Sequence, residues 1–344
     1  MPSGATVPRA ALGRLPLVTL FLSERCNSRC ITCDYWRHGV IDMSLGAVRR
    51  LVPDLLRLRT EVALISGGEP LLNPEWSQIA ELLRGEGVKL WLLTSGLSLA
   101  KHARRVAGLF EAVTVSLDGT DAATYQAIRG LDAFDNVCAG MRAAVQAGAA
   151  VSMRVTVQRA NYRQLPQFIA LAHALGVQQV SFLAVDVANP HAFARRGDIT
   201  GGLALQPADL PVLAALLDRL ESEHAADFES GLIAESPRKL RRIHQYFSAV
   251  CGLAPYPQVR CNVFEYSAVV GASGQVSPCF FISGPQNGHA PGLEAVLNQD
   301  SMMALREDIR TGTRAECARC VCSLWREPDE RAVAHFLPRG RADA

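Results

Sequence analysis

From Val18 onward, short apolar runs alternate with longer stretches in which apolar residues recur every three or four positions. The short runs are typical of buried strands, and the longer period is typical of helices that cover them. Repeated strand–helix units indicate an α/β fold with a parallel sheet. The pattern predicts six strands, over residues 18–22, 62–65, 90–93, 113–117, 151–157 and 180–184.

The helices between these strands are predicted from capping residues and apolar faces. Ser44 is a preferred N-cap residue, and the apolar positions from Leu45 to Leu58 that follow it share one helical face. The same reasoning predicts helices over residues 75–84, 135–146, 165–175 and 207–223.

The regular alternation breaks down between residues 189 and 205, where prolines and glycines interrupt it, so a domain boundary or an active-site loop is expected there. After about Gly231 the strand–helix pattern does not return, and cysteines surround a hairpin-like run over 269–276. The predicted divisions are a lead-in over 1–15, a strand–helix domain over 16–205, a linking helical segment over 206–249, a smaller domain over 250–330 and a tail over 331–344.

Composition narrows the classes of partner. The chain is 49% hydrophobic and 20% charged, as ordinary globular proteins are, and its 35 basic and 33 acidic residues leave a net charge of +2. Nucleic-acid binders carry a basic stripe, so no nucleic-acid partner is expected. No apolar stretch reaches the roughly 18 residues needed to cross a bilayer, so no membrane partner is expected either.

Ten cysteines suggest metal binding rather than disulfides. Three lie within residues 26–33 and three within residues 317–322, which is too close for mutual disulfides but suits a shared metal cluster. Metal-binding thiols indicate a reducing compartment, and we expect a cytoplasmic protein.

Cys26, Cys30 and Cys33 lie in one loop after the first predicted strand. Three thiolates on a cubane iron–sulfur cluster leave one iron open, so that a chelating small molecule can bind it. The alternative is a zinc site that takes a fourth ligand from elsewhere. Ser66-Gly67-Gly68-Glu69-Pro70 follows the second strand, where glycines let a ligand approach the backbone and Glu69 can accept from an ammonium group. Alone, this segment could equally be a tight turn.

Together, the three-cysteine loop and the Gly-Gly-Glu segment resemble those of the radical S-adenosylmethionine (SAM) superfamily over residues 16–205. The resemblance implies a partial (β/α)6 TIM-like barrel and a [4Fe–4S] cluster whose open iron binds the amino and carboxylate groups of SAM. Gly67, Gly68 and Glu69 would contact the amino group. The family usually has an aromatic residue where this chain has Thr32, so Tyr35 or Trp36 would pack against adenine instead.

Polar residues at further strand ends would line the same pocket. Thr94 and Ser95 close the third strand, and Ser116 and Asp118 close the fourth, with groups suited to a ribose or a substrate. Asp118 could instead cap a helix that begins near residue 120. On the fifth strand, Arg154 lies on a polar face and could grip a carboxylate of cofactor or substrate, the alternative being a surface salt bridge.

The C-terminal part resembles the twitch domain, a shortened relative of the SPASM domain that holds an auxiliary cluster. The resemblance implies a second [4Fe–4S] cluster on Cys261, Cys279, Cys317 and Cys320, with Cys322 as an alternative or spare ligand. A structural zinc site is the alternative. Cys251 matches a cysteine that gives a hydrogen atom to the substrate radical in resembling epimerases, whereas Cys138 is expected in the core.

The implied activity is reductive cleavage of SAM to a 5′-deoxyadenosyl radical, which abstracts hydrogen from a substrate. A flavodoxin- or ferredoxin-type protein would supply the electron. Few residues precede Val18, which favours a small molecule such as a sugar, aminocyclitol or natural-product intermediate, undergoing oxidation or epimerisation. The alternatives are a peptide-modifying enzyme of the RiPP maturase type and, from another class, a non-catalytic iron–sulfur electron carrier.

Overall fold

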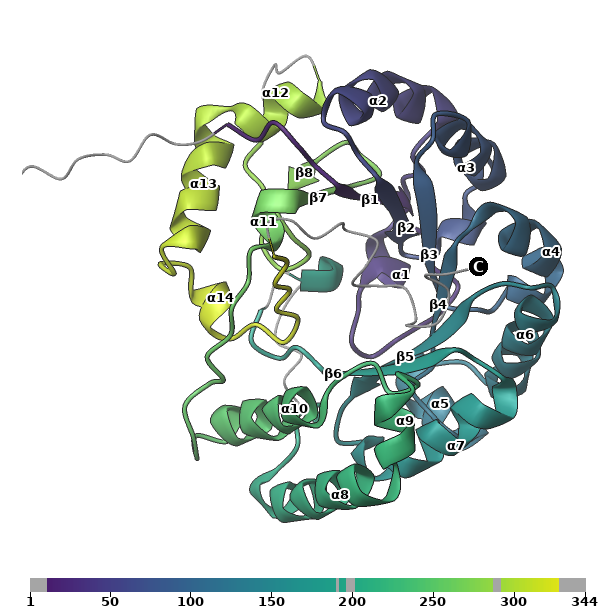
Figure 1. Cartoon of the computed structure of the whole chain (residues 1–344), viewed down its shortest axis with the longest axis vertical. Coiled ribbons are helices and arrows are strands. Elements are labelled where there is room, and N and C mark those ends of the chain that lie inside the picture. The colour runs from purple at the N-terminus through teal and green to yellow at the C-terminus, as the bar shows by residue number, and fades with distance from the viewer. Residues whose placement is uncertain (1–10, 190–191, 196–201, 287–291, 328–344) are drawn as a thin grey trace, which may run out of the picture.

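The computed structural model describes residues 11–189, 192–195, 202–286 and 292–327. Within these residues a single eight-stranded sheet runs in the order β6-β5-β4-β3-β2-β1-β7-β8, as an arc across the molecule (Figure 1). The strands are β1 (Leu17–Ser23), β2 (Val62–Gly67), β3 (Lys89–Thr94), β4 (Ala112–Ser116), β5 (Val151–Val157), β6 (Gln179–Ala184), β7 (Ser267–Val270) and β8 (Val276–Ser277).

The helices that connect β1 to β6 cover the outer face of the arc (Figure 1). They are α2 (Leu45–Arg57), α3 (Trp76–Gly85), α4 (Leu99–Leu109), α5 (Ala122–Arg129), α6 (Phe134–Gln146) and α7 (Leu165–Leu175). A short α1 (Tyr35–His38) and the 3₁₀ turns η1 (Pro70–Leu72), η2 (Tyr162–Gln164) and η3 (Ala192–Ala194) lie in the loops.

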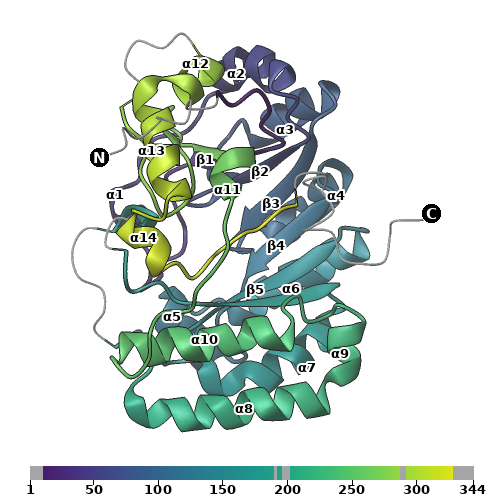
Figure 2. The ribbon, with the colours of Figure 1, turned by 60° about the vertical axis from the view of Figure 1, so that its left-hand side comes forward.

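The C-terminal half adds two groups of helices. Turn η4 (Pro207–Asp209), α8 (Leu210–Glu223), α9 (Ala225–Glu229) and α10 (Pro237–Val250) lie beyond β6. The helices α11 (Val263–Tyr266), α12 (Leu293–Asn298), α13 (Asp300–Arg310) and α14 (Ala315–Ala318) lie on the β7 side, opposite α8 and α10 in both views (Figure 2). No helix among the described residues is long and apolar enough to cross a membrane.

The core lies between the sheet and its outer helices. On β5, alternate residues are fully buried while Ser152, Arg154 and Thr156 remain partly accessible, so the opposite face carries the polar groups. Apolar burial on the helix side is the dominant stabilising term of such a fold. The polar face is the inner face of the arc, where a ligand can lie.

The predicted partial (β/α)6 barrel is confirmed. β1 to β6 pair in parallel and in sequence order, the predicted strands agree with them to within two residues at each end, and the sheet does not close into a ring. Backbone bonds from Val180 to Leu232 and from Ala234 back to Val180 cover the outer edge of β6.

The prediction that the strand–helix pattern ends near Gly231 is wrong. A long helix, α10, follows and the chain then returns as β7, which pairs in parallel with β1. The predicted hairpin over 269–276 is confirmed as the antiparallel β7–β8 pair. The C-terminal part therefore extends the sheet of the barrel; the boundaries of the predicted domains stay a prediction, and the tail over 331–344 lies outside the described residues.

The cap of α2 allows a test of the helix boundaries. Ser44 accepts a hydrogen bond from the Ala47 N–H at 3.1 Å, so Ser44→Ala should lower the free energy of unfolding by about 1 kcal/mol. Ser98 occupies the same position before α4 but makes no capping bond, so Ser98→Ala should cost clearly less. Chemical denaturation of both variants measures the difference, and equal losses would contradict the assigned cap.

Candidate functional site

A cavity of about 360 Å³ opens where the parallel strands of the barrel end. Cys26, Cys30 and Cys33 lie on its wall, opposite residues that follow β2, β3 and β4. The C-terminal ends of parallel strands are the usual position of active sites in barrels of this type. Of the predicted site residues, the lining includes Tyr35, Gly67, Gly68, Thr94, Ser95, Ser116, Asp118 and Cys279.

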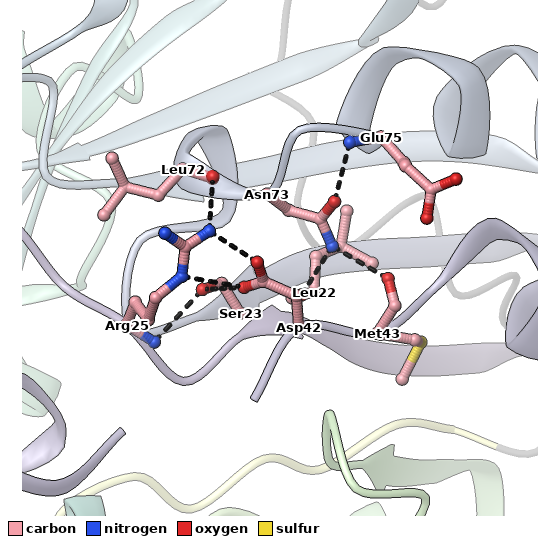
Figure 3. A network of polar contacts seen from close by, with 8 residues as sticks. All are labelled: Leu22, Ser23, Arg25, Asp42, Met43, Leu72, Asn73 and Glu75. Carbon is pink, nitrogen blue, oxygen red and sulfur yellow. Dashed lines mark hydrogen bonds and ion pairs between the residues drawn. The ribbon is translucent and has the colours of Figure 1, made fainter. Parts of the chain in front are cut away.

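The ends of the cysteine loop are tied together by a polar network (Figure 3). Asp42 accepts from Ser23 Oγ at 2.6 Å and pairs with the Arg25 guanidinium, which also donates to the Leu72 carbonyl at 2.9 Å. Buried Asn73 donates to the carbonyls of Leu22 and Met43. These bonds close the loop at its base, so its three thiols are held at one side of the cavity.

Gly67 and Gly68 lie directly against the beginning of that loop. Gly68 N–H donates to the Ser23 carbonyl at 2.7 Å, and a Cβ on Gly68 would lie 2.4 Å from the Arg25 carbonyl oxygen. Gly67 has φ of +131°, which only glycine adopts without strain. The two glycines therefore let the cysteine loop and the end of β2 pack backbone to backbone.

Glu69 joins the ends of β2 and β3. Its fully buried carboxylate accepts from Leu71 N–H at 3.1 Å, Thr94 Oγ1 at 2.8 Å and Ser95 N–H at 2.7 Å. Burial raises the pKa of Glu69, because these three donors carry no charge and only partly offset the loss of solvent. The Ser95 hydroxyl also acts on this carboxylate, so its roughly four acceptor positions are engaged, and Glu69 itself does not line the cavity.

Asp118 and Arg129 form a buried ion pair on the cavity wall. Arg129 Nη2 lies 2.8 Å from Asp118 Oδ2, while Asp118 Oδ1 accepts from Thr156 N–H at 2.7 Å. The alternative prediction that Asp118 caps the next helix is wrong, because Asp121 caps α5 through the Thr124 N–H. The arginine of this pair also contacts a thiol, because Arg129 Nη1 donates to Cys30 Sγ at 3.5 Å.

The three thiols of the loop interact with one another. Burial raises the pKa of Cys26 to about 11 and that of Cys33 to about 12, and the charge of Cys30 adds to both shifts. A metal that binds these thiols would have to displace their protons. In the described part of the chain, no three His, Cys, Asp or Glu side chains approach closely enough to hold a single metal ion. A cubane cluster is several atoms wide, so its ligands stand further apart than those of one ion.

Aromatic side chains form the rest of the cavity wall. Tyr35 packs edge-on against Phe21 at 5.9 Å, and Phe193 packs in the same manner against Phe281 at 5.7 Å. Of the two predicted replacements for the missing aromatic residue at Thr32, Tyr35 lines the cavity and Trp36 does not; the Trp36 indole instead donates to the Cys30 carbonyl. Several aromatic groups from distant segments thus supply a flat apolar surface.

The structure also gathers the C-terminal thiols. Burial raises the pKa of Cys279 to about 12 and that of Cys317 to about 11, and it raises those of Cys320 and Cys322 as well. The charge of Cys261 contributes to all four shifts, so all four thiols lie near it. Their proximity is what a shared metal cluster requires.

Several predicted site residues lie away from the cavity wall, among them Cys251 and Arg154. Cys251 follows α10 and donates to the Leu205 carbonyl at 3.3 Å, and it does not line the cavity. Arg154 on β5 does not line it either. Burial raises the pKa of the Cys322 thiol and the Arg154 charge offsets part of that rise, while Arg154 Nε has no hydrogen-bond partner among the described residues. Of these two, only Arg154 lies near the clustered cysteines.

The sequence interpretation missed several wall residues. Arg129 lies far from Cys30 in the sequence, and nothing in its local pattern distinguishes it from a surface arginine at a helix end. Phe280 and Phe281 could be associated with the site only because they follow Cys279, which lines the cavity together with them.

Comparison with known proteins gives relatives for the barrel. Residues 20–172 match the family model of the radical SAM superfamily. Pre-heme d1 synthase of Dinoroseobacter shibae is 33% identical over 51% of this chain and 45% of its own length. GTP 3',8-cyclase of Erythrobacter litoralis is 30% identical over 47% of this chain and 52% of its own length. The chain thus spans about half the length of these curated relatives.

Solved structures extend the likeness of fold beyond the barrel. SuiB of Streptococcus suis, crystallised with its precursor peptide SuiA, matches 92% of this chain and 73% of its own, with a TM-score of 0.66 and 13% identity. The protein anSMEcpe with bound AdoMet matches 90% of this chain and 89% of its own, with a TM-score of 0.63 and 18% identity. The family match over residues 20–172, which include the cysteine loop and the ends of the first strands, identifies this part of the chain as a radical SAM domain.

Proposed function

We propose that this chain is a radical SAM enzyme that binds a [4Fe–4S] cluster on Cys26, Cys30 and Cys33 and SAM beside it. The observation that carries the proposal is that all three thiols line one cavity with Gly67 and Gly68. Two further features fit such an occupant. Ser28 Oγ and Arg129 Nε are buried at this wall and have no hydrogen-bond partner within the described residues.

The cluster, when bound and reduced by one electron, supplies the cleavage of SAM to methionine and a 5′-deoxyadenosyl radical. The chain's own residues bind and orient the cofactor. Buried Glu69 fixes the ends of β2 and β3, where Gly67 and Gly68 offer their backbone to the amino group, and Ser116 offers a hydroxyl to the ribose. Tyr35 and Phe193 provide apolar surface for the adenine and exclude water from the cavity.

A second cluster on Cys261, Cys279, Cys317 and Cys320 is part of the proposal. The mutual influence of these thiols supports it. Cys279 also lines the main cavity, so this cluster would face the substrate. Such a position suits an electron acceptor for a substrate oxidation, with Cys322 and Arg154 next to it.

The proposed substrate is a small molecule. Its support comes from the curated relatives, whose names include a GTP 3',8-cyclase, a pre-heme d1 synthase and a Fe-coproporphyrin III synthase. Oxidation fits the geometry better than epimerisation, because Cys251, the proposed hydrogen donor for an epimerase, lies outside the cavity lining. A carrier without catalysis is disfavoured, since a cavity of about 360 Å³ beside the thiols leaves room for a ligand.

Peptide modification is the second candidate. The observation in its favour is that the fold neighbour SuiB, which matches 92% of this chain, was crystallised with its precursor peptide. The rate of SAM consumption distinguishes the two candidates. It rises on addition of the precursor peptide if the enzyme modifies peptides, and it does not rise if the substrate is a small molecule.

Anaerobic reconstitution of the full chain tests the proposal. We expect about eight irons per chain for two clusters, a reduced electron paramagnetic resonance (EPR) signal that changes when SAM is added, and 5′-deoxyadenosine after addition of dithionite. A content of about four irons together with the SAM response would support the cluster on the three-cysteine loop and contradict the second cluster. A chain that binds zinc, or iron without any response to SAM, would contradict the proposed activity.

A further inference from the structure

Cys30 is held by α5 from two sides. The backbone N–H groups of Arg29 and Ile31, its two neighbours in the loop, donate to the carbonyls of Arg129 and Ile128 at 2.9 and 3.0 Å. These carbonyls belong to the last turn of α5, which has no partners of its own for them. The end of the helix therefore fixes the backbone on both sides of this thiol.

The side chain at the end of that helix turns back to the same thiol. Arg129 donates from Nη1 to Cys30 Sγ at 3.5 Å and from Nη2 to Asp118 Oδ2 at 2.8 Å. Its side chain is 12% exposed and that of Asp118 is 3% exposed, so water screens this contact little. Within the described part of the chain, the buried Arg129 Nε has no hydrogen-bond partner, although Arg129 lies at the cavity wall.

We propose that Arg129, oriented by Asp118, is a positioning residue that donates to the Cys30 thiolate and raises the reduction potential of the cluster bound there. The inference rests on the proposed function, because it requires that a cluster is held by the loop. Asp118 acts on the cluster through Arg129, because one of its oxygens pairs with Arg129 Nη2 while the other accepts from Thr156 N–H.

The physical reason is the charge of the reduced state. One-electron reduction by an external donor adds one negative charge to the cluster and its thiolates. A guanidinium cannot lose its proton in a protein, so Arg129 stabilises the reduced form more than the oxidised form. Asp118 opposes this effect, but the arginine stands between it and the thiol, and the Coulomb energy falls with distance.

An EPR-monitored redox titration of the reconstituted full chain tests the inference, with the SAM-responsive signal as the readout. At the wild-type midpoint potential, Arg129→Gln should lower the ratio of reduced to oxidised cluster at least about tenfold, as loss of a buried charge contact implies. Arg129→Lys keeps the charge without the forked geometry, so its ratio of reduced to oxidised cluster should lie between those of the wild type and Arg129→Gln. Asp118→Asn should raise the potential, because it removes the carboxylate charge that opposes the effect of Arg129.

Arg37→Gln is the matched control. Arg37 lies in α1, just after the cysteine loop, but it is exposed and pairs with Asp34 at 3.3 Å, so its loss should leave the potential unchanged. If Arg129 only anchors α5, its variants lose iron or stability while the clusters that remain keep the wild-type potential. That result would overturn the inference.

Two other outcomes are also decisive. If Arg129→Gln holds no cluster, Asp118→Asn decides alone, and an unchanged or more negative potential in that variant would overturn the inference. If the wild type itself gives no SAM-responsive signal, the proposed function fails, and with it the inference. A responsive wild type with identical variants leaves the proposed function intact and removes only the role of Arg129.

Discussion

Replacing Cys26, Cys30 and Cys33 together by alanine should abolish formation of 5′-deoxyadenosine from SAM. Without the three thiols no cluster with an open iron is held beside Gly67 and Gly68, so SAM has no iron to bind there and receives no electron at its sulfonium. We expect a loss of at least about a thousandfold, to the background of the assay, because removal of a cofactor removes the chemistry it supplies. Chromatography of dithionite-treated samples measures the product.

The same variant should still fold and should retain the iron of the second cluster. The thiols around Cys261 belong to other segments, so the iron content should fall by about four per chain and not to zero. Cys138→Ala is the matched control, since Cys138 is a buried residue of α6 without a place in either thiol group. A triple variant that still makes 5′-deoxyadenosine would disprove the assignment of these ligands.

Gly68→Ala should lower the free energy of unfolding by about 1–3 kcal/mol, in the range of overpacking within a core. The added methyl group would lie 2.4 Å from the Arg25 carbonyl oxygen and 2.6 Å from that of Glu24, and both contacts are backbone atoms that cannot rotate away. The cysteine loop would have to move outward from the end of β2. We therefore expect poor cluster loading in addition to the loss of stability.

Gly46→Ala provides the comparison for this variant. Gly46 lies in the first turn of α2, where an added methyl group meets nothing closer than 3.8 Å. Alanine there should stabilise the chain by about 0.5–1 kcal/mol, because glycine weakens a helix. Thermal unfolding of both variants and their iron content after reconstitution give the result. Equal stability of the two would show that the loop does not pack on β2 as described.

The elements of the barrel could be predicted because their signal is local. Strands such as β1 are apolar runs, and β5 alternates apolar and polar residues. The apolar face of α2 and its cap at Ser44 are likewise visible in neighbouring residues. The return of the chain as β7 could not be predicted in this way. Four residues, Ser267–Val270, become a strand because β1 offers them an open edge, and no window of sequence contains both partners.

The same difference between local and long-range signals applies to the residues of the candidate site. The three cysteines and the Gly-Gly-Glu segment could be found from their spacing, and the structure brings them to one cavity. Arg129 could not, because its role depends on the fold placing the end of α5 against Cys30. The sequence also could not tell that Arg154 faces Cys322 and not the wall of the main cavity.

The pairing of β1 with β7 has a consequence for how the chain folds. Leu17, in the first strand, pairs with Ser267, so one side of β1 stays without its neighbour until most of the chain has been synthesised. Closing so long a loop is entropically costly, and open strand edges attract other chains during that time. The first strand of the sheet is thus among the last to be completed, and the nascent barrel passes through a stage at which it is prone to aggregate.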